Sequence, residues 1–417
     1  MTTIRIPDLR EPIRTPEERQ IHEMSLSMEV DLSVDSLVAA ATRRTGLTDF
    51  GATGVLDRLA LQVAAVDADA GLAGIGRYLV RRRLVGLLSA RLRYEDYLRR
   101  HPEAHDIDLD PPVIVVGLPR SGTTHLVNLL AEDPRFRSLP FWELLEPIPV
   151  TGDGPGRDGV DPRYLRAVEQ HRITREASPL TALMHDQAPS SIEEECELMD
   201  LDLCAYPLEW IARVPSWRDH YLRLDQHAHY RFLREALQVL THLRGPRRWV
   251  LKSPQHLEQL GPLMAAFPDA TVAFTLRDPV AVLQSALTML AYADRTRRAS
   301  VDADELAAYW VDRIERLLRA AVRDAQLIPS GRRVDIAFHR FMADQVGAVT
   351  SVLHAAGLEV SDTDSARFDT YVGSHPRGRD GRLAYDLRED FGLDPSTVFD
   401  RYAFYFDAFP EVRREVH

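Results

Sequence analysis

The amino-acid sequence predicts an α/β fold of the P-loop type, with three layers in which helices flank a central parallel sheet. The run 113–116, Val-Ile-Val-Val, is short, continuous and β-branched, as buried parallel strands are. A glycine-containing turn follows it, and residues 121–132 then place Leu126, Leu129 and Leu130 on one side of a helix. Strand, loop and helix in this order form one unit of a parallel α/β sheet.

Three further strands continue this pattern. We predict them at residues 248–251, 271–276 and 334–338, separated by helices near 226–244, 256–266, 279–293 and 302–326. A polar or basic residue follows each strand directly, namely Lys252, Arg277 and His339. Because ligands of open α/β sheets bind outside the carboxyl ends of the strands, we expect these residues to lie near a binding site.

A helical region, residues 1–110, is expected to precede this α/β domain of residues 111–417. Residues 1–25 are polar and rich in Pro, Arg and Glu, which is typical of an arm that either frays or wraps around the body. Residues 33–100 are predicted to be helical, with apolar residues at helical spacing beside several arginines. This region either roofs a substrate site or mediates the formation of a homo-oligomer.

The overall composition limits the classes of function. The formal net charge is −12, which argues against nonspecific nucleic-acid binding, because such binding requires a basic surface. Cys196 and Cys204 are too few for a disulfide framework, and we expect them to be buried free thiols. We find neither a secretory signal at the N-terminus nor an apolar run long enough to span a membrane. The protein is therefore expected to be cytoplasmic.

The loop Gly117-Leu-Pro-Arg-Ser-Gly-Thr-Thr124 predicts a phosphate site. Backbone N–H groups at such a turn point into a shared concavity, and the helix N-terminus adds partial positive charge. Gly122 allows the backbone to approach an oxyanion, while Arg120 supplies a fixed cation. The residues expected to bind phosphate are Pro119, Arg120, Ser121, Gly122, Thr123 and Thr124.

The same loop differs from the nucleoside-triphosphate loop G-x-x-x-x-G-K-[ST]. Its two glycines are correctly spaced, but Thr123 stands where that loop has the lysine that reaches the β- and γ-phosphates. No second acidic strand end offers a magnesium ligand, so we expect no metal site. A nucleotide-dependent kinase or NTPase is therefore the alternative hypothesis, and a non-catalytic nucleotide-binding protein is a third.

The motif Pro-Arg-Ser-Gly-Thr-Thr resembles the 5′-phosphosulfate loop of sulfotransferases that use 3′-phosphoadenosine-5′-phosphosulfate (PAPS) as donor. Arg277 follows a strand and Ser285 comes eight residues later, which is the family's pattern for the donor's 3′-phosphate. The resemblance covers about residues 111–405. It is closest to a bacterial branch that also has Trp-Val-Leu-Lys-Ser-Pro-Gln-His (249–256) and Glu-Glu-Glu-Cys (193–196), and tyrosylprotein sulfotransferases are more distant relatives.

This resemblance implies an activity and roles for several residues. The protein would transfer a sulfuryl group from PAPS to a hydroxyl or amine by in-line displacement, releasing 3′-phosphoadenosine-5′-phosphate (PAP). Arg120 and Lys252 would stabilise charge on the leaving phosphate. Glu143 lies close to where tyrosylprotein sulfotransferases have their catalytic glutamate, and His256 competes with it as general base.

One part of the family pattern has only a loose counterpart. Cytosolic small-molecule sulfotransferases have a lysine where this chain has Arg120, and an Arg-Lys-Gly segment near the C-terminus. Here Arg377, Arg379 and Arg382 are the analogous basic residues, which we expect to contact the 3′-phosphate.

The acceptor is not identified by the sequence, which fits a small molecule, a lipid, a glycan or a peptide hydroxyl. Glu193, Glu194 and Glu195 either orient a substrate, pair with an active-site arginine, or form a solvated helix start. Three aromatic residues either line an apolar acceptor pocket or pack in the core: Tyr206, Trp210 and Trp217.

Overall fold

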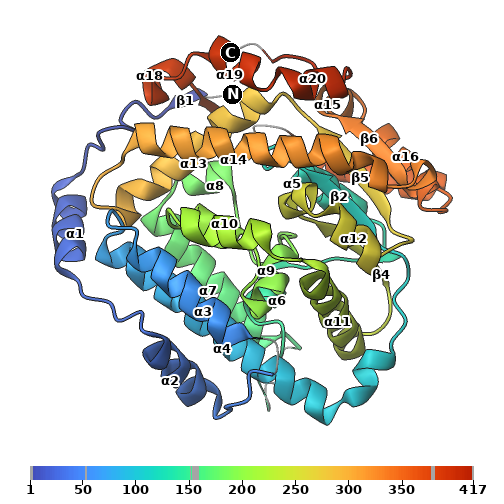
Figure 1. The fold of residues 1–417 in the computed structure, drawn as a ribbon. Coiled ribbons are helices and arrows are strands. Elements are labelled where there is room, and N and C mark those ends of the chain that lie inside the picture. The colour runs from blue at the N-terminus through green and yellow to red at the C-terminus, as the bar shows by residue number, and fades with distance from the viewer. Residues whose placement is uncertain (1–2, 52–53, 151, 153–158, 377–380, 416–417) are drawn as a thin grey trace.

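A computed structural model describes residues 3–51, 54–150, 152, 159–376 and 381–415. Its main sheet has five parallel strands in the order β3-β4-β2-β5-β6 (Figure 1). The strands are β2 Val113–Gly117, β3 Phe136–Arg137, β4 Arg248–Lys252, β5 Thr271–Leu276 and β6 Arg333–Ala337. The predicted fold is therefore confirmed, with strand ends that differ from the prediction by one residue at most.

Helices account for most of the remaining chain. Those before the loop are α1 Pro16–Ser27, α2 Val34–Thr45, α3 Val55–Asp67 and α4 Gly74–Arg100. Those that follow it, up to the middle of the chain, are α5 Thr123–Ala131, α6 Phe141–Leu145, α7 Pro162–Ala177, α8 Thr181–Met184, α9 Cys196–Met199, α10 Pro215–Arg223 and α11 His227–Arg244. The later ones are α12 Leu260–Ala266, α13 Pro279–Arg297, α14 Ala303–Asp324, α15 Phe338–Ala343, α16 Gln345–Ala355, α17 Asp362–Ser374, α18 Leu387–Phe391, α19 Pro395–Arg401 and α20 Ala403–Ala408.

Short 3₁₀ helices join several of these elements. They are η1 Pro102–Asp106, η2 Asp200–Asp202, η3 Pro207–Trp210, η4 Pro254–Glu258, η5 Ala325–Leu327 and η6 Ser330–Arg332. The predicted helix 256–266 is in fact divided into η4 and α12. Pro262 explains the division, because it has no N–H to donate and fits only the first turn of a helix.

The two faces of the sheet are covered by separate hydrophobic clusters. Val113 and Val115 of β2 pack in one cluster with apolar residues of α5, α16 and α17. Ile114 and Val116 point to the opposite face, into a larger cluster that includes residues of α11, α13 and α14. Alternate side chains of one strand thus enter different cores, which is why this strand is apolar throughout.

The N-terminal helices belong to the larger cluster as well. Leu37, Leu59 and Leu84 are fully or almost fully buried within it. Figure 1 shows α1–α4 on one side of the molecule and the sheet on the other, with α14 running across the upper part of the view toward the sheet. The predicted helical character of residues 33–100 is confirmed.

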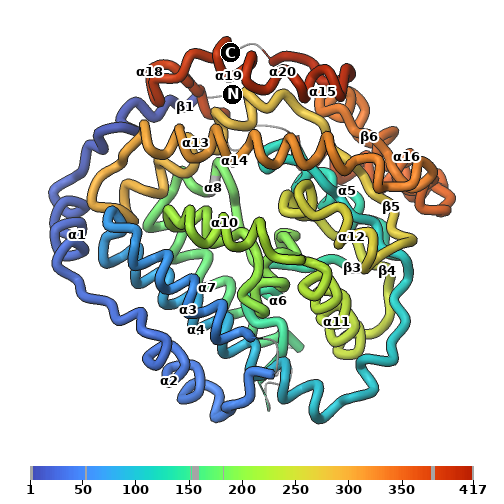
Figure 2. The backbone as a smooth tube through the Cα atoms, viewed as in Figure 1, coloured from blue at the N-terminus to red at the C-terminus, as the bar shows by residue number. Residues whose placement is uncertain are grey.

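Residues from near the two ends of the chain form a second, two-stranded sheet. β1, Thr3–Arg5, pairs in parallel with β7, Arg382–Ala384. Arg5 also forms an ion pair of 2.7 Å with Asp390 of α18, and Figure 2 shows β1 beside the C-terminal helices. Part of the predicted N-terminal arm therefore wraps around the body.

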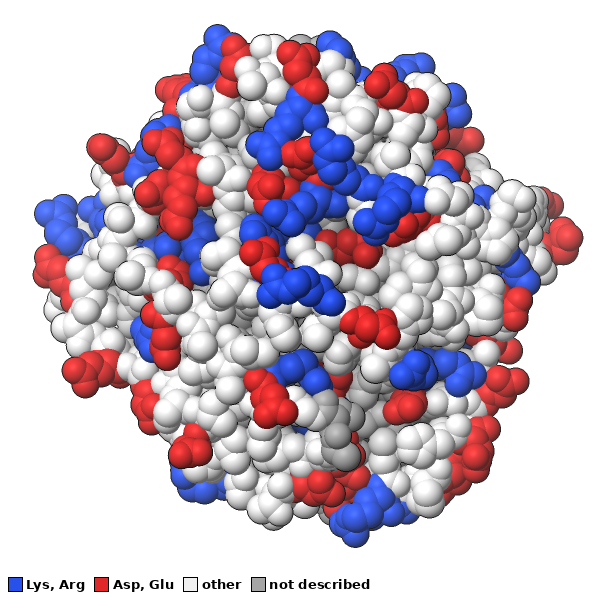
Figure 3. All heavy atoms as spheres, in the orientation of Figure 1, with Lys and Arg blue, Asp and Glu red and all other residues white. Residues whose placement is uncertain are grey.

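The surface charge and the length of the helices bear on two kinds of partner, nucleic acids and membranes. Basic side chains lie among acidic ones on the face that Figure 3 draws, and do not cover it continuously. Among the helices of the described residues, none is both long and apolar enough to cross a membrane.

A buried ion-pair network ties α14 to the sheet edge. Arg313 is fully buried and contacts Glu209 of η3 at 3.0 Å and Glu258 of η4 at 2.6 Å. Burial raises the pKa of Glu209, although Arg313 opposes that shift. Glu209 therefore depends on the buried arginine for its counter-charge in a dry environment.

Replacing Arg313 by methionine should destabilise the fold strongly. We expect the free energy of unfolding to fall by roughly 3–5 kcal/mol, because two carboxylates are left buried without a counter-charge. Urea denaturation followed by tryptophan fluorescence measures the change. The matched control is Arg316→Met on the same helix, whose pair with Asp312 is exposed and contributes at most about 1 kcal/mol. Equal losses in both variants would contradict this account.

Candidate active site

The loop between β2 and α5 is anchored to the neighbouring strand β5. A side chain at Gly117 would place its Cβ 1.8 Å from the Thr275 hydroxyl oxygen, so only glycine fits. The buried hydroxyl of Ser121 donates to the carbonyl of Leu118 at 2.6 Å and lies 2.7 Å from the same Thr275 hydroxyl. Ser121, predicted to bind the ligand, thus uses its hydroxyl inside the loop.

Arg120 and Gly122 both have left-handed backbone, with φ of 65° and 88°. This conformation costs a non-glycine residue on the order of 1–3 kcal/mol and is found mainly at functional sites. Arg277 stabilises it by donating to the Arg120 carbonyl. The turn directs the Arg120 guanidinium toward Ser285, whose hydroxyl accepts from Nε at 3.0 Å, and toward the carbonyl of Met184.

Three candidate site residues that are far apart in the sequence therefore meet at the carboxyl edge of the sheet. Arg277 leaves β5, Ser285 lies in α13, and Arg120 contacts both. Burial, the largest effect, and the nearby Arg277 lower the pKa of Arg120. Tyr385, which the sequence analysis missed, joins the group with its hydroxyl 3.3 Å from that of Ser285.

Arg277 has a further partner at the C-terminal end of the described chain. Its Nε and one terminal nitrogen contact the two carboxylate oxygens of Glu415 at 2.6 and 2.7 Å. The guanidinium also lies 4.1 Å from the centre of the Phe338 ring. The predicted phosphate-binding arginine is thus held by an internal carboxylate.

A cavity of about 280 Å³ opens beside the loop. Four loop residues line one part of it: Pro119, Arg120, Thr123 and Thr124. Apolar and aromatic side chains form another wall, made by Tyr206, Pro207, Trp210, Ile211, Met289, Leu290 and Ala293. The rest of the lining is polar or charged and consists of Arg83, Thr181, His185, Gln187, Glu193, Glu194, Glu197 and Arg297.

The acidic segment 193–195 is not a solvated helix start. Glu195 is fully buried and contacts the backbone N–H of Lys252 at 2.7 Å and His256 Nε2 at 2.6 Å. Glu194 forms an ion pair of 2.8 Å with the buried ammonium of Lys252. Burial alone would lower the pKa of Lys252, but Glu194 and Glu193 outweigh it and the pKa is raised. Lys252 is therefore a charged residue directly behind the cavity wall.

Glu193 differs from its two neighbours because half of its carboxylate has no partner. It is 4% exposed, and its Oε1 makes no hydrogen bond although it is buried. Its Oε2 lies 3.5 Å from His185 Nε2. Burial opposes ionisation, yet His185 and Lys252 outweigh it and lower the pKa of Glu193. The cavity thus holds an ionised carboxylate with an unused oxygen, next to a histidine that the sequence analysis did not single out.

The two residues predicted as general bases lie elsewhere. Glu143 is buried in ion pairs with Arg137 at 3.1 Å and Arg244 at 2.7 Å. His256 is fully buried, and its second nitrogen meets the Tyr230 hydroxyl at 2.7 Å. Neither side chain lines the cavity. Each is instead held by hydrogen bonds or ion pairs with residues that are distant in the sequence or on other elements.

The remaining predicted residues are placed as follows. Tyr206 and Trp210 line the cavity, whereas Trp217 is buried in the core. Arg382 is exposed at the start of β7. Arg377 and Arg379 lie outside the described residues. Cys196 and Cys204 are buried free thiols, as predicted.

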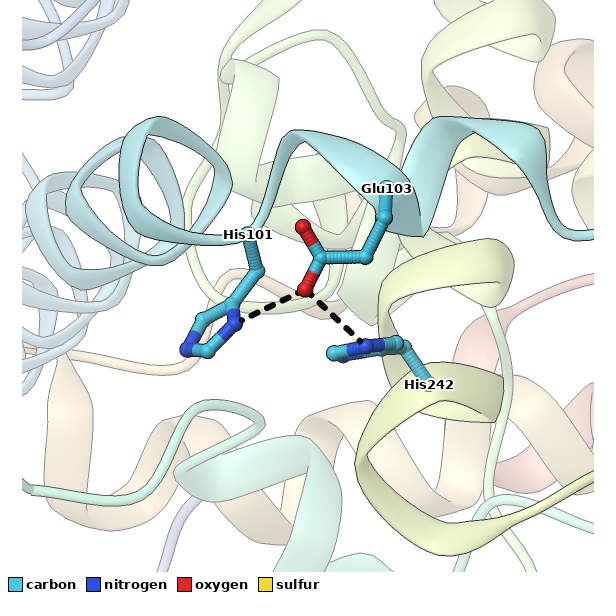
Figure 4. A group of neighbouring side chains, drawn as sticks. All are labelled: His101, Glu103 and His242. Carbon is cyan, nitrogen blue, oxygen red and sulfur yellow. Dashed lines mark hydrogen bonds and ion pairs between the residues drawn. The ribbon is translucent and has the colours of Figure 1, made fainter.

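One cluster has the composition of a metal site and lies on other elements (Figure 4). His101, Glu103 and His242 bring one ligand atom each within 4.8 Å of one another. Both imidazoles approach the same Glu103 oxygen, at 3.1 and 3.5 Å, and the Tyr97 hydroxyl lies 2.5 Å from the other nitrogen of His242. These hydrogen bonds and ion pairs account for the arrangement without an ion.

Comparisons with known proteins agree with one another. Residues 111–362 match the model of the sulfotransferase family. Sulfotransferase STF1 from Mycobacterium tuberculosis H37Rv is 29% identical, with a TM-score of 0.78 over 89% of this chain and 98% of its own. STF9 from Mycobacterium avium is 25% identical, with a TM-score of 0.81 over 94% and 100%.

A curated relative is more distant in sequence. Omega-hydroxy-beta-dihydromenaquinone-9 sulfotransferase Stf3 of Mycobacterium bovis is 22% identical over 318 residues, which are 72% of this chain and 77% of that protein. The family model covers more than half of the chain, including the loop 117–124, Lys252, Arg277 and Ser285. On this evidence, the chain belongs to the sulfotransferase family and is a sulfotransferase.

Proposed function

We propose that the protein transfers the sulfuryl group of PAPS to a hydroxyl group of an acceptor held in the cavity beside the loop. The observation that carries this proposal is the meeting of Arg120, Arg277 and Ser285 next to that cavity. A phosphate loop and a second anion-binding pair suit a ligand with two separated phosphate groups. Thr123, in place of the lysine of nucleoside-triphosphate loops, argues against Mg-ATP.

Donor binding follows from this arrangement. The 5′-phosphosulfate lies against the N-terminus of α5, where backbone N–H groups and the hydroxyls of Thr123 and Thr124 are available. The 3′-phosphate is held by Arg277 and Ser285 through charge-assisted hydrogen bonds. Arg382 and the basic residues just before it remain proposed contacts of the same phosphate.

Fixed cations account for most of the rate enhancement. The acceptor oxygen bonds to sulfur as the bond from sulfur to the bridging phosphate oxygen breaks, and PAP leaves with the electron pair. Arg120 stabilises the charge that develops on that oxygen, and Lys252 contributes from behind the wall. Each preorganised donor of this kind is typically worth about 10²–10³ in rate.

The acceptor proton passes to His185, which Glu193 positions. Because Glu193 is ionised, the His185 Nε2–H points to it and leaves Nδ1 free to accept the proton. The imidazolium that forms is then stabilised by the buried carboxylate, as in other histidine–carboxylate pairs. This assignment replaces Glu143 and His256, which do not line the cavity.

The acceptor is an amphipathic alcohol, since one group of the residues that line the cavity is apolar and aromatic. Trp210, Ile211 and Leu290 are suited to an apolar body, while the polar end carries the reacting hydroxyl. The curated relative Stf3 is named for a hydroxylated menaquinone, which is an acceptor of this class.

Replacing Arg277 and Arg120 by alanine should separate binding from turnover. We expect Arg277→Ala to weaken PAP binding at least about 30-fold, because a charged partner of a phosphate is lost. Arg120→Ala should mainly lower kcat, by about 10²–10³. Calorimetry with PAP in EDTA and steady-state kinetics measure the two effects. Arg340→Ala, an exposed arginine after β6, is the control. Undetectable PAP binding by the wild-type protein would refute the proposed donor.

Two pairs of variants distinguish the proposed base from the earlier candidates. We expect His185→Ala and Glu193→Gln to lower kcat by about 10²–10⁴ and to leave the Kd for PAP within about twofold. Glu143→Gln and His256→Ala are matched controls, compared after thermal unfolding confirms that each variant folds. A large loss of kcat in folded Glu143→Gln, with near-normal Glu193→Gln, would return the role to Glu143.

A further inference from the structure

The ion pair with Glu415 occupies the side-on edge of the Arg277 guanidinium, formed by Nε and one terminal nitrogen. Two guanidinium nitrogens face the Glu415 carboxylate, and the third donates to the Arg120 carbonyl. Phe338 covers one face of the guanidinium. A phosphate can therefore take the side-on, two-pronged contact with Nε and this terminal nitrogen of Arg277 only when Glu415 moves away.

The segment that carries Glu415 is itself held against the body. Phe409 and Val412 are 5% and 7% exposed and belong to the large hydrophobic cluster. The backbone N–H of Glu415 donates to the Asp278 carboxylate at 2.7 Å. The carboxylate is therefore delivered to Arg277 by a built contact, and the Arg277 and Glu415 side chains are only 13% and 31% exposed.

We propose that Glu415 is an intramolecular competitor for the 3′-phosphate subsite, which lowers the affinity of the protein for both PAPS and PAP. This inference rests on the proposed function, since it takes Arg277 to be the 3′-phosphate ligand. The apparent Kd of the nucleotide equals its intrinsic Kd divided by the fraction of molecules in which Arg277 is free.

The competition favours turnover. A 3′-phosphate carries a charge of about −1.5 to −2 and three acceptor oxygens, so it displaces a singly charged carboxylate when the donor is present. After transfer, Glu415 can return to Arg277 as PAP leaves. Release of a tightly held product limits kcat in many enzymes, and an internal anion that reoccupies the subsite counters this.

Nucleotides with and without a 3′-phosphate test the proposal. In Glu415→Gln, Arg277 loses its charged competitor, so we expect the Kd for PAP to fall by about tenfold. Adenosine 5′-monophosphate has no 3′-phosphate, and its Kd should stay within about twofold. Calorimetry in EDTA measures both ligands on the full-length protein. Glu411→Gln, a carboxylate on the same segment, is the matched control and should change neither Kd.

A double variant locates the effect. In the Arg277→Ala background, Glu415→Gln should no longer alter PAP binding. An unchanged Kd for PAP in Glu415→Gln, or an equal gain for both nucleotides, would overturn the proposal, because general electrostatics would then explain the gain. Failure of the wild-type protein and of Glu415→Gln to bind PAP would instead refute the donor assignment, and the inference with it.

Discussion

The buried carboxylate of Glu195 holds the two sides of the site together. One oxygen accepts from the backbone N–H of Lys252 at the end of β4, and the other contacts His256 at the start of the next segment. These contacts clamp the acidic segment against the sheet edge, so that Glu194 meets the Lys252 ammonium and Glu193 faces the cavity. A solvated segment of the same composition could not hold carboxylates at fixed positions in a dry environment, where charges interact most strongly.

Several cations near the carboxyl edge of the sheet are paired with carboxylates of the chain itself. Lys252 faces Glu194, and Arg277 faces Glu415. Arg120 differs, because its hydrogen bonds go to a hydroxyl and a carbonyl, which are neutral groups. Among the described residues no carboxylate forms an ion pair with it, and a strained backbone holds it beside the cavity. Unpaired buried charge is costly, so an anionic ligand at this position gains more than it would from a cation already in an ion pair.

The sheet and its loop could be predicted because their determinants are local. The apolar run 113–116, the spacing of the two glycines and the residues that leave each strand are all read within short windows. Because the strands are parallel, the residues that follow their carboxyl ends lie at the same edge of the sheet. The division of the predicted helix 256–266 into η4 and α12 was missed. Pro262 is compatible with any position in the first turn of a helix, so it does not show at which residue α12 begins. β3 was missed because two residues give no periodicity.

The candidate functional residues also divide into those set by local sequence and those set by long-range contacts. The sequence by itself determined the turn 117–124 before α5 and the placement of Arg277 and Ser285 near it, because each depends on short-range spacing and on the order of strands. Only the tertiary structure decided which carboxylates and histidines reach the cavity. Glu143 looked like a base by position but is neutralised by two arginines that come from other elements. Glu193 looked like one of three similar acids in the sequence. In the structure Glu194 and Glu195 pair with Lys252 and His256, whereas one oxygen of Glu193 has no hydrogen-bond partner. Ionic partners separated by many residues leave no periodic signal in a chain, and these partners determine whether a charged side chain is available for chemistry.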